Sequence, residues 1–399
     1  MAFHYHKNAL GQLHREGGLH AYEHGDGSKE WWINGKKHRD GGLPAVEYIN
    51  GDKEWWVNGN LHREGGLPAV DGKRRDEDDV GSKEWWVNGL RHREGDLPAV
   101  EYFNGNKQWW VNGKRHRAND LPAIEYNEVR IWWVNGLRHR EGGRPAVVGG
   151  GRNEWWVNGK QHRDGGLPAF VGVGINEGYN EWWVNGKRHR DNGLPAIDQE
   201  TTPWFGSKEW WVNGKQHRDG DLPATECANG DKEWFKDGKR HRENGLPAVE
   251  RNGIKEWYEN NKLHRDGDLP AIEWANGTKE WFINGKLYRD NGLPTIERFN
   301  GSREWWVNYK LHRDGGLPAI EWGDGRKVWY INGKRLSHEK GLAYFAFCKK
   351  MAEKKRVRAQ KKIYFWWIQI CYDLEHPSGC GIRMARKNLE VFETMMSVY

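Results

Sequence analysis

Short runs of aromatic and β-branched residues alternate with polar ones along most of this chain, and Asn, Asp and Gly separate the runs. In the first clear example, residues 30–33 read Glu-Trp-Trp-Ile, Asn34-Gly35 follows, and residues 36–39 read Lys-Lys-His-Arg. A period of two is typical of β-strands, and Asn-Gly is a favoured two-residue hairpin turn. Residues 30–39 are therefore predicted to form an antiparallel β-hairpin.

The same pattern recurs along residues 28–334, close to K-E-W-W-V-N-G-K-x-H-R-D-G-G-L-P-A-V-E-Y-x-N-G, and most copies are 23 or 24 residues apart. A unit of this size cannot bury a core alone and stacks on its neighbours. We therefore predict a mainly β protein, an elongated array of antiparallel hairpins. The first tryptophan of each copy falls at Trp31, Trp55, Trp85, Trp109, Trp132, Trp155, Trp182, Trp210, Trp234, Trp257, Trp281, Trp305 and Trp329.

Three regions are predicted from where the repeat begins and fails. Residues 1–27 hold a degenerate copy with His14 and Arg15 but Lys7 where tryptophan is due, and are expected to cap the array. Residues 28–334 hold about thirteen copies. Residues 335–399 are basic and are predicted to form a small, mainly helical C-terminal cap, which would cover the open edge of the sheet.

The two adjacent aromatic positions differ between copies. The first is tryptophan in all thirteen, whereas the second becomes Phe235, Tyr258, Phe282 and Tyr330 in four of them. Because adjacent strand residues point to opposite faces, we expect the first row to be packed and the second to lie in a looser, partly wet layer. The second row is a candidate binding surface, formed by Trp32, Trp56, Trp86, Trp110, Trp133, Trp156, Trp183, Trp211 and Trp306.

A His-Arg pair follows the hairpin in almost every copy. A catalytic group is needed once, so a histidine that recurs twelve times is better explained as part of the ladder than as a catalyst or a metal ligand, which stay open as alternatives. Arg39 and its equivalents are expected to stack on a neighbouring tryptophan and to pair with Asp40 or Glu30. They could equally serve as a binding surface, because Arg and Trp are enriched at interaction hot spots.

These residues carry a resemblance to a known family. The run W-V-N-G-K-x-H-R-x-G resembles the MORN repeat, and Trp32, Asn34, Gly35, Lys36, His38 and Gly41 match its pattern. Arg39 departs from it by replacing a glycine, and Leu43-Pro44 lengthens the unit. The chain is similar to a divergent MORN-like class of large DNA viruses, and the resemblance implies a meander of hairpins.

Composition and charge narrow the function classes. The net charge of +7 resides in residues 335–399, which hold 13 Lys and Arg against 6 Asp and Glu, so the array itself is balanced. Four cysteines make no disulfide framework, and no apolar leader or membrane-spanning run is present. We expect an intracellular protein, cytoplasmic or virion-associated and not secreted.

The C-terminal region is predicted to begin with a helix over 342–362 that has Phe345, Cys348, Met351 and Ala352 on one side. Either this side docks on the array, or the helix binds an acidic partner, nucleic acid or a membrane surface. A last helix is expected from about Ile382. The candidate basic patch is formed by Lys349, Lys350, Lys354, Lys355, Arg356, Arg358, Lys361 and Lys362.

No nucleophile, metal or phosphate-binding motif stands out, so we predict neither an enzyme nor a cofactor. A metal site at Cys371, His376 and Cys380 is a minor alternative, because zinc usually takes two close ligand pairs. The predicted function is a noncatalytic scaffold or interaction repeat protein that binds another protein or itself, with a viral or host assembly as one setting. The alternative is a carbohydrate- or lipid-headgroup-binding module that uses the second aromatic row.

Overall fold

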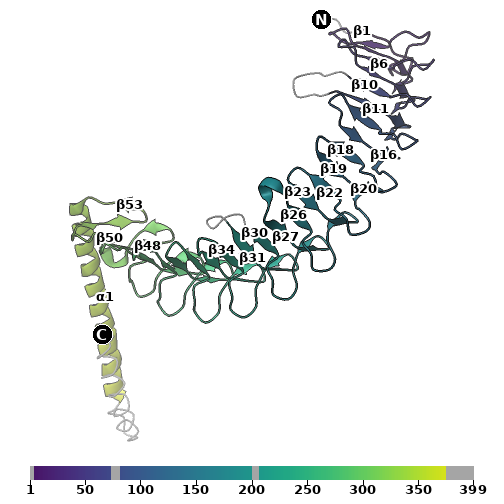
Figure 1. Cartoon of the computed structure of the whole chain (residues 1–399). Coiled ribbons are helices and arrows are strands. Elements are labelled where there is room, and N and C mark those ends of the chain that lie inside the picture. The colour runs from purple at the N-terminus through teal and green to yellow at the C-terminus, as the bar shows by residue number, and fades with distance from the viewer. Residues whose placement is uncertain (1–3, 73–80, 200–205, 374–399) are drawn as a thin grey trace. The chain divides into compact units, whose positions relative to one another are not determined.

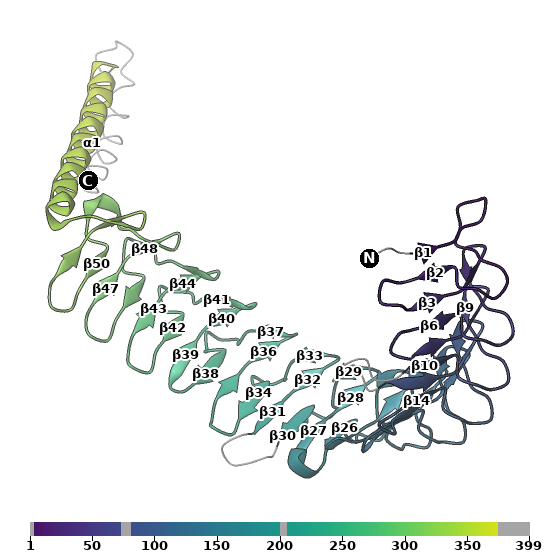
Figure 2. The ribbon, with the colours of Figure 1, turned by 90° about the horizontal axis from the view of Figure 1, so that it is seen from above.

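The structure is a computed structural model that describes residues 4–72, 81–199 and 206–373. In these ranges it holds 53 short strands and one long helix, so the predicted mainly β hairpin array with a helical C-terminal element is confirmed. The chain divides into two compact units, Met1–Lys239 and Arg240–Tyr399. Within each unit, consecutive hairpins lie side by side, as Figure 1 and Figure 2 show.

Each copy contributes four short strands rather than the two that the sequence predicts. In the first complete copy these are β3 (Lys29–Glu30), β4 (Trp32–Ile33), β5 (Lys36–Lys37) and β6 (Val46–Glu47). β4 and β5 pair only with each other, whereas β3 pairs with β6, and β6 pairs with β7 (Lys53–Glu54) of the next copy. Each copy therefore adds two strands to an antiparallel meander and projects a separate small hairpin.

The break between β3 and β4 falls on the first tryptophan. The Trp31 backbone N–H donates to the Ala45 carbonyl at 2.9 Å, and its own carbonyl accepts from the His38 N–H at 3.1 Å. Because these bonds tie Trp31 to both halves of its copy, the chain leaves the main sheet at this residue and starts the hairpin.

Twenty-seven of the strands in the described ranges belong to main-sheet ladders. Besides β3, β6 and β7, those of the first unit are β1 (His4–Tyr5), β2 (Tyr22–Glu23), β10 (Val70–Gly72), β11 (Ser82–Glu84), β14 (Val100–Tyr102), β15 (Lys107–Gln108), β18 (Ile124–Tyr126), β19 (Val129–Ile131), β22 (Val147–Gly149), β23 (Arg152–Glu154), β26 (Phe170–Gly172), β27 (Tyr179–Glu181), β30 (Ile197–Gln199), β31 (Ser207–Glu209), β34 (Thr225–Cys227) and β35 (Lys232–Glu233). Those of the second unit are β38 (Val249–Arg251), β39 (Ile254–Glu256), β42 (Ile272–Glu273), β43 (Lys279–Glu280), β46 (Ile296–Glu297), β47 (Arg303–Glu304), β50 (Ile320–Glu321) and β51 (Lys327–Val328).

The remaining strands form thirteen two-stranded hairpins in the same ranges. After β4 and β5 these are β8 (Trp56–Val57) and β9 (Asn60–Leu61), β12 (Trp86–Val87) and β13 (Leu90–Arg91), β16 (Trp110–Val111) and β17 (Lys114–Arg115), β20 (Trp133–Val134) and β21 (Leu137–Arg138), β24 (Trp156–Val157) and β25 (Lys160–Gln161), β28 (Trp183–Val184) and β29 (Lys187–Arg188), β32 (Trp211–Val212) and β33 (Lys215–Gln216), β36 (Phe235–Lys236) and β37 (Lys239–Arg240), β40 (Tyr258–Glu259) and β41 (Lys262–Leu263), β44 (Phe282–Ile283) and β45 (Lys286–Leu287), β48 (Trp306–Val307) and β49 (Lys310–Leu311), and β52 (Tyr330–Ile331) and β53 (Lys334–Arg335).

The hairpin turns have the predicted conformation. Asn34 and Gly35 both have positive φ, 49° and 73°, as a type I′ turn requires. Tyr309 stands where the other turns have glycine or asparagine, and it keeps the left-handed backbone with φ 60°. Its hydroxyl donates to the Gly285 carbonyl of the preceding copy at 3.1 Å, which offsets part of the strain.

The core is a seam of tryptophan and alanine. The thirteen first-row tryptophans are only 4–8% exposed, and the alanine after each Leu-Pro is fully buried in almost every copy. The first row is therefore packed, as predicted. The Ala45 N–H also donates to the Glu54 carbonyl of the next copy, and this bond brings the two backbones close together. A small side chain is therefore needed beside the indole.

One helix, α1 (His338–Asp373), follows the last hairpin. The short 3₁₀ turns η1 (Gly174–Asn176) and η2 (Asp314–Gly316) interrupt two loops, and the first turns of α1 pack against η2. Gly341 lies so close to the Trp329 ring that a Cβ there would collide with it. The helix continues past the predicted end at 362, and the helix expected from Ile382 lies outside the described residues.

Candidate functional site: the grooves between consecutive repeats

Every first-row indole donates its N–H to the loop of the preceding copy. Trp132 Nε1, for example, lies 2.9 Å from the Asp120 carbonyl oxygen. The acceptor is always the residue just before the Leu-Pro position of the preceding loop. The pairs are Trp31 with Gly18, Trp55 with Gly42, Trp85 with Gly66, Trp109 with Asp96, Trp155 with Gly143, Trp182 with Gly166, Trp210 with Gly193, Trp234 with Asp221, Trp257 with Gly245, Trp281 with Asp268, Trp305 with Gly292 and Trp329 with Gly316.

Among the contacts of the described residues, an arginine stacks on the first-row ring of eleven copies, with 3.6–3.8 Å between the Arg Cζ atom and the ring centre. The predicted stacking of Arg39 on Trp31 is therefore confirmed. Its predicted pairing is wrong, because Arg39 Nη1 donates to the Pro44 carbonyl at 3.1 Å and to Glu47 at 3.0 Å. Asp40 pairs with the imidazole of His38 instead.

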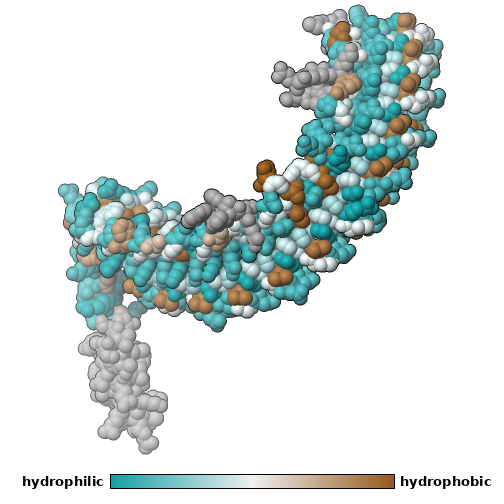
Figure 3. Space-filling view, in the orientation of Figure 1, coloured by the Kyte–Doolittle hydropathy of each residue, from teal (hydrophilic) through white to brown (hydrophobic). Residues whose placement is uncertain are grey.

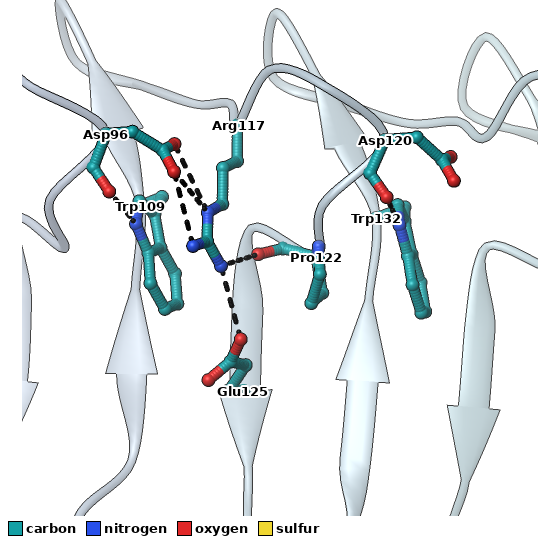
Figure 4. A network of polar contacts seen from close by, with 7 residues as sticks. All are labelled: Asp96, Trp109, Arg117, Asp120, Pro122, Glu125 and Trp132. Carbon is teal, nitrogen blue, oxygen red and sulfur yellow. Dashed lines mark hydrogen bonds and ion pairs between the residues drawn. The ribbon is translucent and has the colours of Figure 1, made fainter.

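The residue before Leu-Pro defines two kinds of junction between one copy and the next. In an Asp-type junction this residue is aspartate, and its carboxylate accepts from the arginine of the next copy. Asp96 accepts from Arg117 Nε at 3.2 Å, while Arg117 Nη1 donates to the Pro122 carbonyl and to Glu125 (Figure 4). Asp120 pairs with Arg140, and Asp268 with Arg289, in the same way.

In a Gly-type junction the same position is glycine, so the preceding loop supplies no carboxylate. The Nε atoms of Arg39, Arg265 and Arg313 are buried and have no hydrogen-bond partner among the described residues. Desolvation of the Arg313 guanidinium lowers its pKa, whereas the hydrogen bonds that Arg289 donates to Asp268 help to raise the pKa of Arg289 against the same desolvation. The two junction types thus differ by one carboxylate.

The histidines join consecutive copies, as the ladder interpretation expects. His38 Nδ1 accepts from the backbone N–H of Asn58, in the hairpin turn of the next copy, at 3.2 Å. An Nδ1 that accepts a bond carries no proton, so Nε2 holds the proton and donates to Asp40 at 2.9 Å. The bond to the next turn recurs at His14, His62, His92, His116, His139, His162, His189, His217, His264 and His312.

Grooves lie between consecutive His-Arg loops. One of 510 Å³ is lined by residues 62–67 of one loop and by residues 92–94 and Leu97 of the next, with Trp85 between them. An equivalent groove of 220 Å³ in the second unit has Trp257 and Arg265 in its wall. Half-exposed leucines form the rims, and hydrophobic patches recur along the stacked loops in Figure 3. These leucines are Leu19, Leu43, Leu67, Leu97, Leu121, Leu167, Leu194, Leu222, Leu246, Leu269 and Leu293.

The second aromatic row is half-buried, in agreement with the predicted looser layer. Most of its indoles donate to the side chain two residues earlier, as Trp56 Nε1 does to Glu54 at 2.9 Å, whereas Trp133 Nε1 has no hydrogen-bond partner among the described residues. Cations lie between successive rings: Arg91 is 4.8 Å from the Trp86 ring centre and 5.3 Å from that of Trp110. The indole N–H of each ring in this row other than Trp133 is therefore already bonded within the chain.

The other predicted site residues are apart from the grooves. The basic side chains at 349, 350, 354–356, 358, 361 and 362 are exposed along α1. The structure does not describe the side chain of Cys371, and His376 and Cys380 lie outside the described residues. It therefore shows nothing of the minor metal site. Sequence reasoning missed the Asp–Arg junctions. The sequence does contain a signal for these junctions: aspartate replaces glycine before Leu-Pro at residues 96, 120, 221 and 268.

Comparison with known proteins adds no further assignment. No family model matches the chain, and a search of curated proteins found no match. Over the ranges that the structure describes, no helix combines the length and apolarity needed to span a membrane.

Proposed function

We propose that this chain is a MORN-like, noncatalytic interaction repeat protein, and that its partner is a protein that lies across the grooves between consecutive His-Arg loops. One observation carries this proposal: the same groove architecture, with a stacked arginine beside an apolar leucine rim, is found in both units, beside Trp85 and beside Trp257. Recurrent exposed apolar side chains next to Arg and Trp are typical of protein interfaces. A partner that is itself extended could contact several steps at once and gain affinity by avidity.

The proposal also covers the identity of the partner and the location of the interaction in the cell. A second copy of the chain, or another component of a viral or host assembly inside the cell, would serve as the partner. The balanced charge of the array and the absence of a disulfide framework in the sequence support an intracellular location.

Carbohydrate or lipid-headgroup binding through the second aromatic row stays an untested alternative. A sugar stacking on Trp86 or Trp110 would have to displace Arg91 from the ring face, and it would find the indole N–H already bonded to Glu84 or Gln108. These contacts favour the grooves over the row as the binding surface.

Site-specific photo-crosslinking tests the proposal. A benzoylphenylalanine replaces Leu67 or Leu97, which flank one groove, and in a matched control it replaces Ile49, which is exposed in the turn between β6 and β7. In the cell that produces the protein, both groove positions are expected to yield the same protein adduct, and Ile49 none. No adduct from the groove positions, or identical adducts from all three, would reject the proposal.

A further inference from the structure

The Asp-type junctions show which ligand the stacked arginine binds. Arg140 Nε and Nη2 donate to the two carboxylate oxygens of Asp120 at 2.9 and 3.0 Å. Arg289 holds Asp268 with the same two atoms at 2.8 and 3.0 Å. Two parallel N–H donors match the geometry of a carboxylate. The free edge of this guanidinium is thus a carboxylate clamp.

The Gly-type junctions hold the same clamp without its ligand. Arg265 stacks 3.6 Å from the Trp257 ring centre, and its Nη1 donates to the Pro270 carbonyl and to Glu273, as in the Asp-type junctions. Its Nε has no hydrogen-bond partner among the described residues. A buried donor without a partner is costly, so a ligand that accepts from it gains binding free energy.

The space for this ligand is present. A Cβ placed on Gly245 would meet no heavy atom within 4 Å, so the first atom of an aspartate side chain fits at this position. The groove of 220 Å³ lies at this point, with Leu246 and Leu269 on its rims. Arg265 itself lines this groove.

We infer that the Gly-type junctions bind the carboxylates of an acidic, extended protein segment, one side chain to each groove, in the position that Asp96, Asp120 and Asp268 occupy elsewhere. This inference rests on the proposed function and names the chemistry of the partner. The arginines of the Gly-type junctions are Arg39, Arg63, Arg93, Arg163, Arg190, Arg218, Arg265 and Arg313.

The surroundings favour a carboxylate on a peptide over a phosphate. Glu243, Glu259 and Asp266 also line this groove, beside His241 and His264. A phosphate carrying nearly two negative charges would meet more repulsion from them than a singly charged carboxylate. The leucine rims offer apolar contact to a peptide and none to a free anion.

The test measures binding of fluorescein-labelled decaglutamate to the full-length protein by fluorescence anisotropy. In a filled variant, aspartate replaces glycine at Gly42, Gly166, Gly193, Gly245 and Gly292, so that five grooves receive an internal carboxylate. In an opened variant, Asp120→Gly and Asp268→Gly create two new empty clamps. The charge control changes five exposed lysines to glutamine, Lys53, Lys107, Lys232, Lys279 and Lys327, and lowers the net charge by the same five units.

We expect the filled variant to bind decaglutamate about tenfold or more weakly than the unchanged protein, a loss of one charge-assisted contact or more. The opened variant is expected to bind more tightly, and the lysine control to change binding less than threefold. Because the opened variant gains binding, a folding defect cannot imitate the result. Equal weakening in the filled variant and the lysine control, or no gain on opening, would overturn the inference.

Competition separates the ligand classes. Free glutamate is expected to displace the probe from the clamps more effectively than inorganic phosphate at equal concentration, and the reverse order would overturn the carboxylate assignment. The photo-crosslinking of Leu67 and Leu97 stands apart from this experiment. Adducts there together with unchanged decaglutamate binding in the filled variant would reject the acidic partner and keep the proposed function.

Discussion

Two neighbouring junctions of the first unit differ at the residue before the Leu-Pro position, which is aspartate in one and glycine in the other. Between Asp120 and Arg140, the preceding loop supplies a carboxylate that joins two copies by accepting from Nε and Nη2, which form one edge of the guanidinium. Between Gly143 and Arg163, the same arginine keeps only the stack on Trp155 and the bond to the Pro168 carbonyl. The backbone path is shared, since Gly143 and Asp120 both have positive φ and both accept an indole N–H. The tryptophan thus joins consecutive copies at both junctions, whereas the carboxylate is present at only one of the two.

The largest effect is expected from the shared element. Trp132→Ala and Trp155→Ala each remove a buried indole and its bond to the preceding copy, and each should lower the free energy of unfolding by about 3–5 kcal/mol. Urea unfolding followed by circular dichroism measures this loss. A large difference between the two variants would mean that the carboxylate, rather than the indole, sustains the Asp-type junction.

The arginine should distinguish the junctions next. Arg140→Ala removes the stack and leaves the Asp120 carboxylate without its main partner, so we expect a loss of about 2–3 kcal/mol. Arg163→Ala removes a stack and one bond to a carbonyl, and should cost about 1–2 kcal/mol. The same urea titrations compare the two, and Arg140→Lys provides the control that keeps charge but not the two-pronged geometry.

Introducing an aspartate before Leu-Pro is expected to stabilise a Gly-type junction. In Gly166→Asp, the new side chain faces Arg190 as Asp120 faces Arg140, and aspartate tolerates the left-handed backbone there. We expect a gain of about 0.5–1 kcal/mol, the value of one partly exposed ion pair less some strain. A double-mutant cycle with Arg190→Gln isolates the pair, and no coupling in that cycle would contradict the proposed equivalence of the two junction types.

The smallest effect is a difference in acid sensitivity. The hydrogen bond from Arg140 lowers the pKa of Asp120 below its ordinary value of 3.8. A carboxylate with a lowered pKa stabilises the fold at pH values above 3.8, and this contribution is lost as the pH falls through the lower, folded-state pKa. The urea midpoint should therefore fall less between pH 6 and pH 3 for Asp120→Asn than for the unchanged protein. An identical fall in both proteins would show that this pair carries no acid dependence.

The sequence predicts most of the fold because every local signal repeats. Asn34-Gly35 specifies the turn, the invariant first tryptophan specifies the seam, and the variable second ring specifies the looser layer. The number of strands per copy was wrong, since no pattern of polarity reveals that the bonds of Trp31 to Ala45 and His38 end the main-sheet strand there.

The candidate site was predicted only in part. Stacking of Arg39 on Trp31 could be inferred from composition, but its partners were sought among near neighbours in sequence. Asp120 and Arg140 are 20 residues apart and meet only because consecutive copies lie in register. The helix was predicted over 342–362, whereas α1 begins at His338, and it extends beyond 362 because no glycine or proline interrupts it there.

Hydrogen exchange of the indole N–H groups, observed by ¹⁵N-resolved NMR and assigned with single Trp→Phe variants, tests the central claim most directly. If each first-row indole is buried and donates to the preceding copy, thirteen indole N–H signals should exchange slowly, whereas that of the partly exposed Trp322 should exchange fast. First-row signals that exchange as fast as that of Trp322 would contradict a seam in which one indole joins each copy to the one before it.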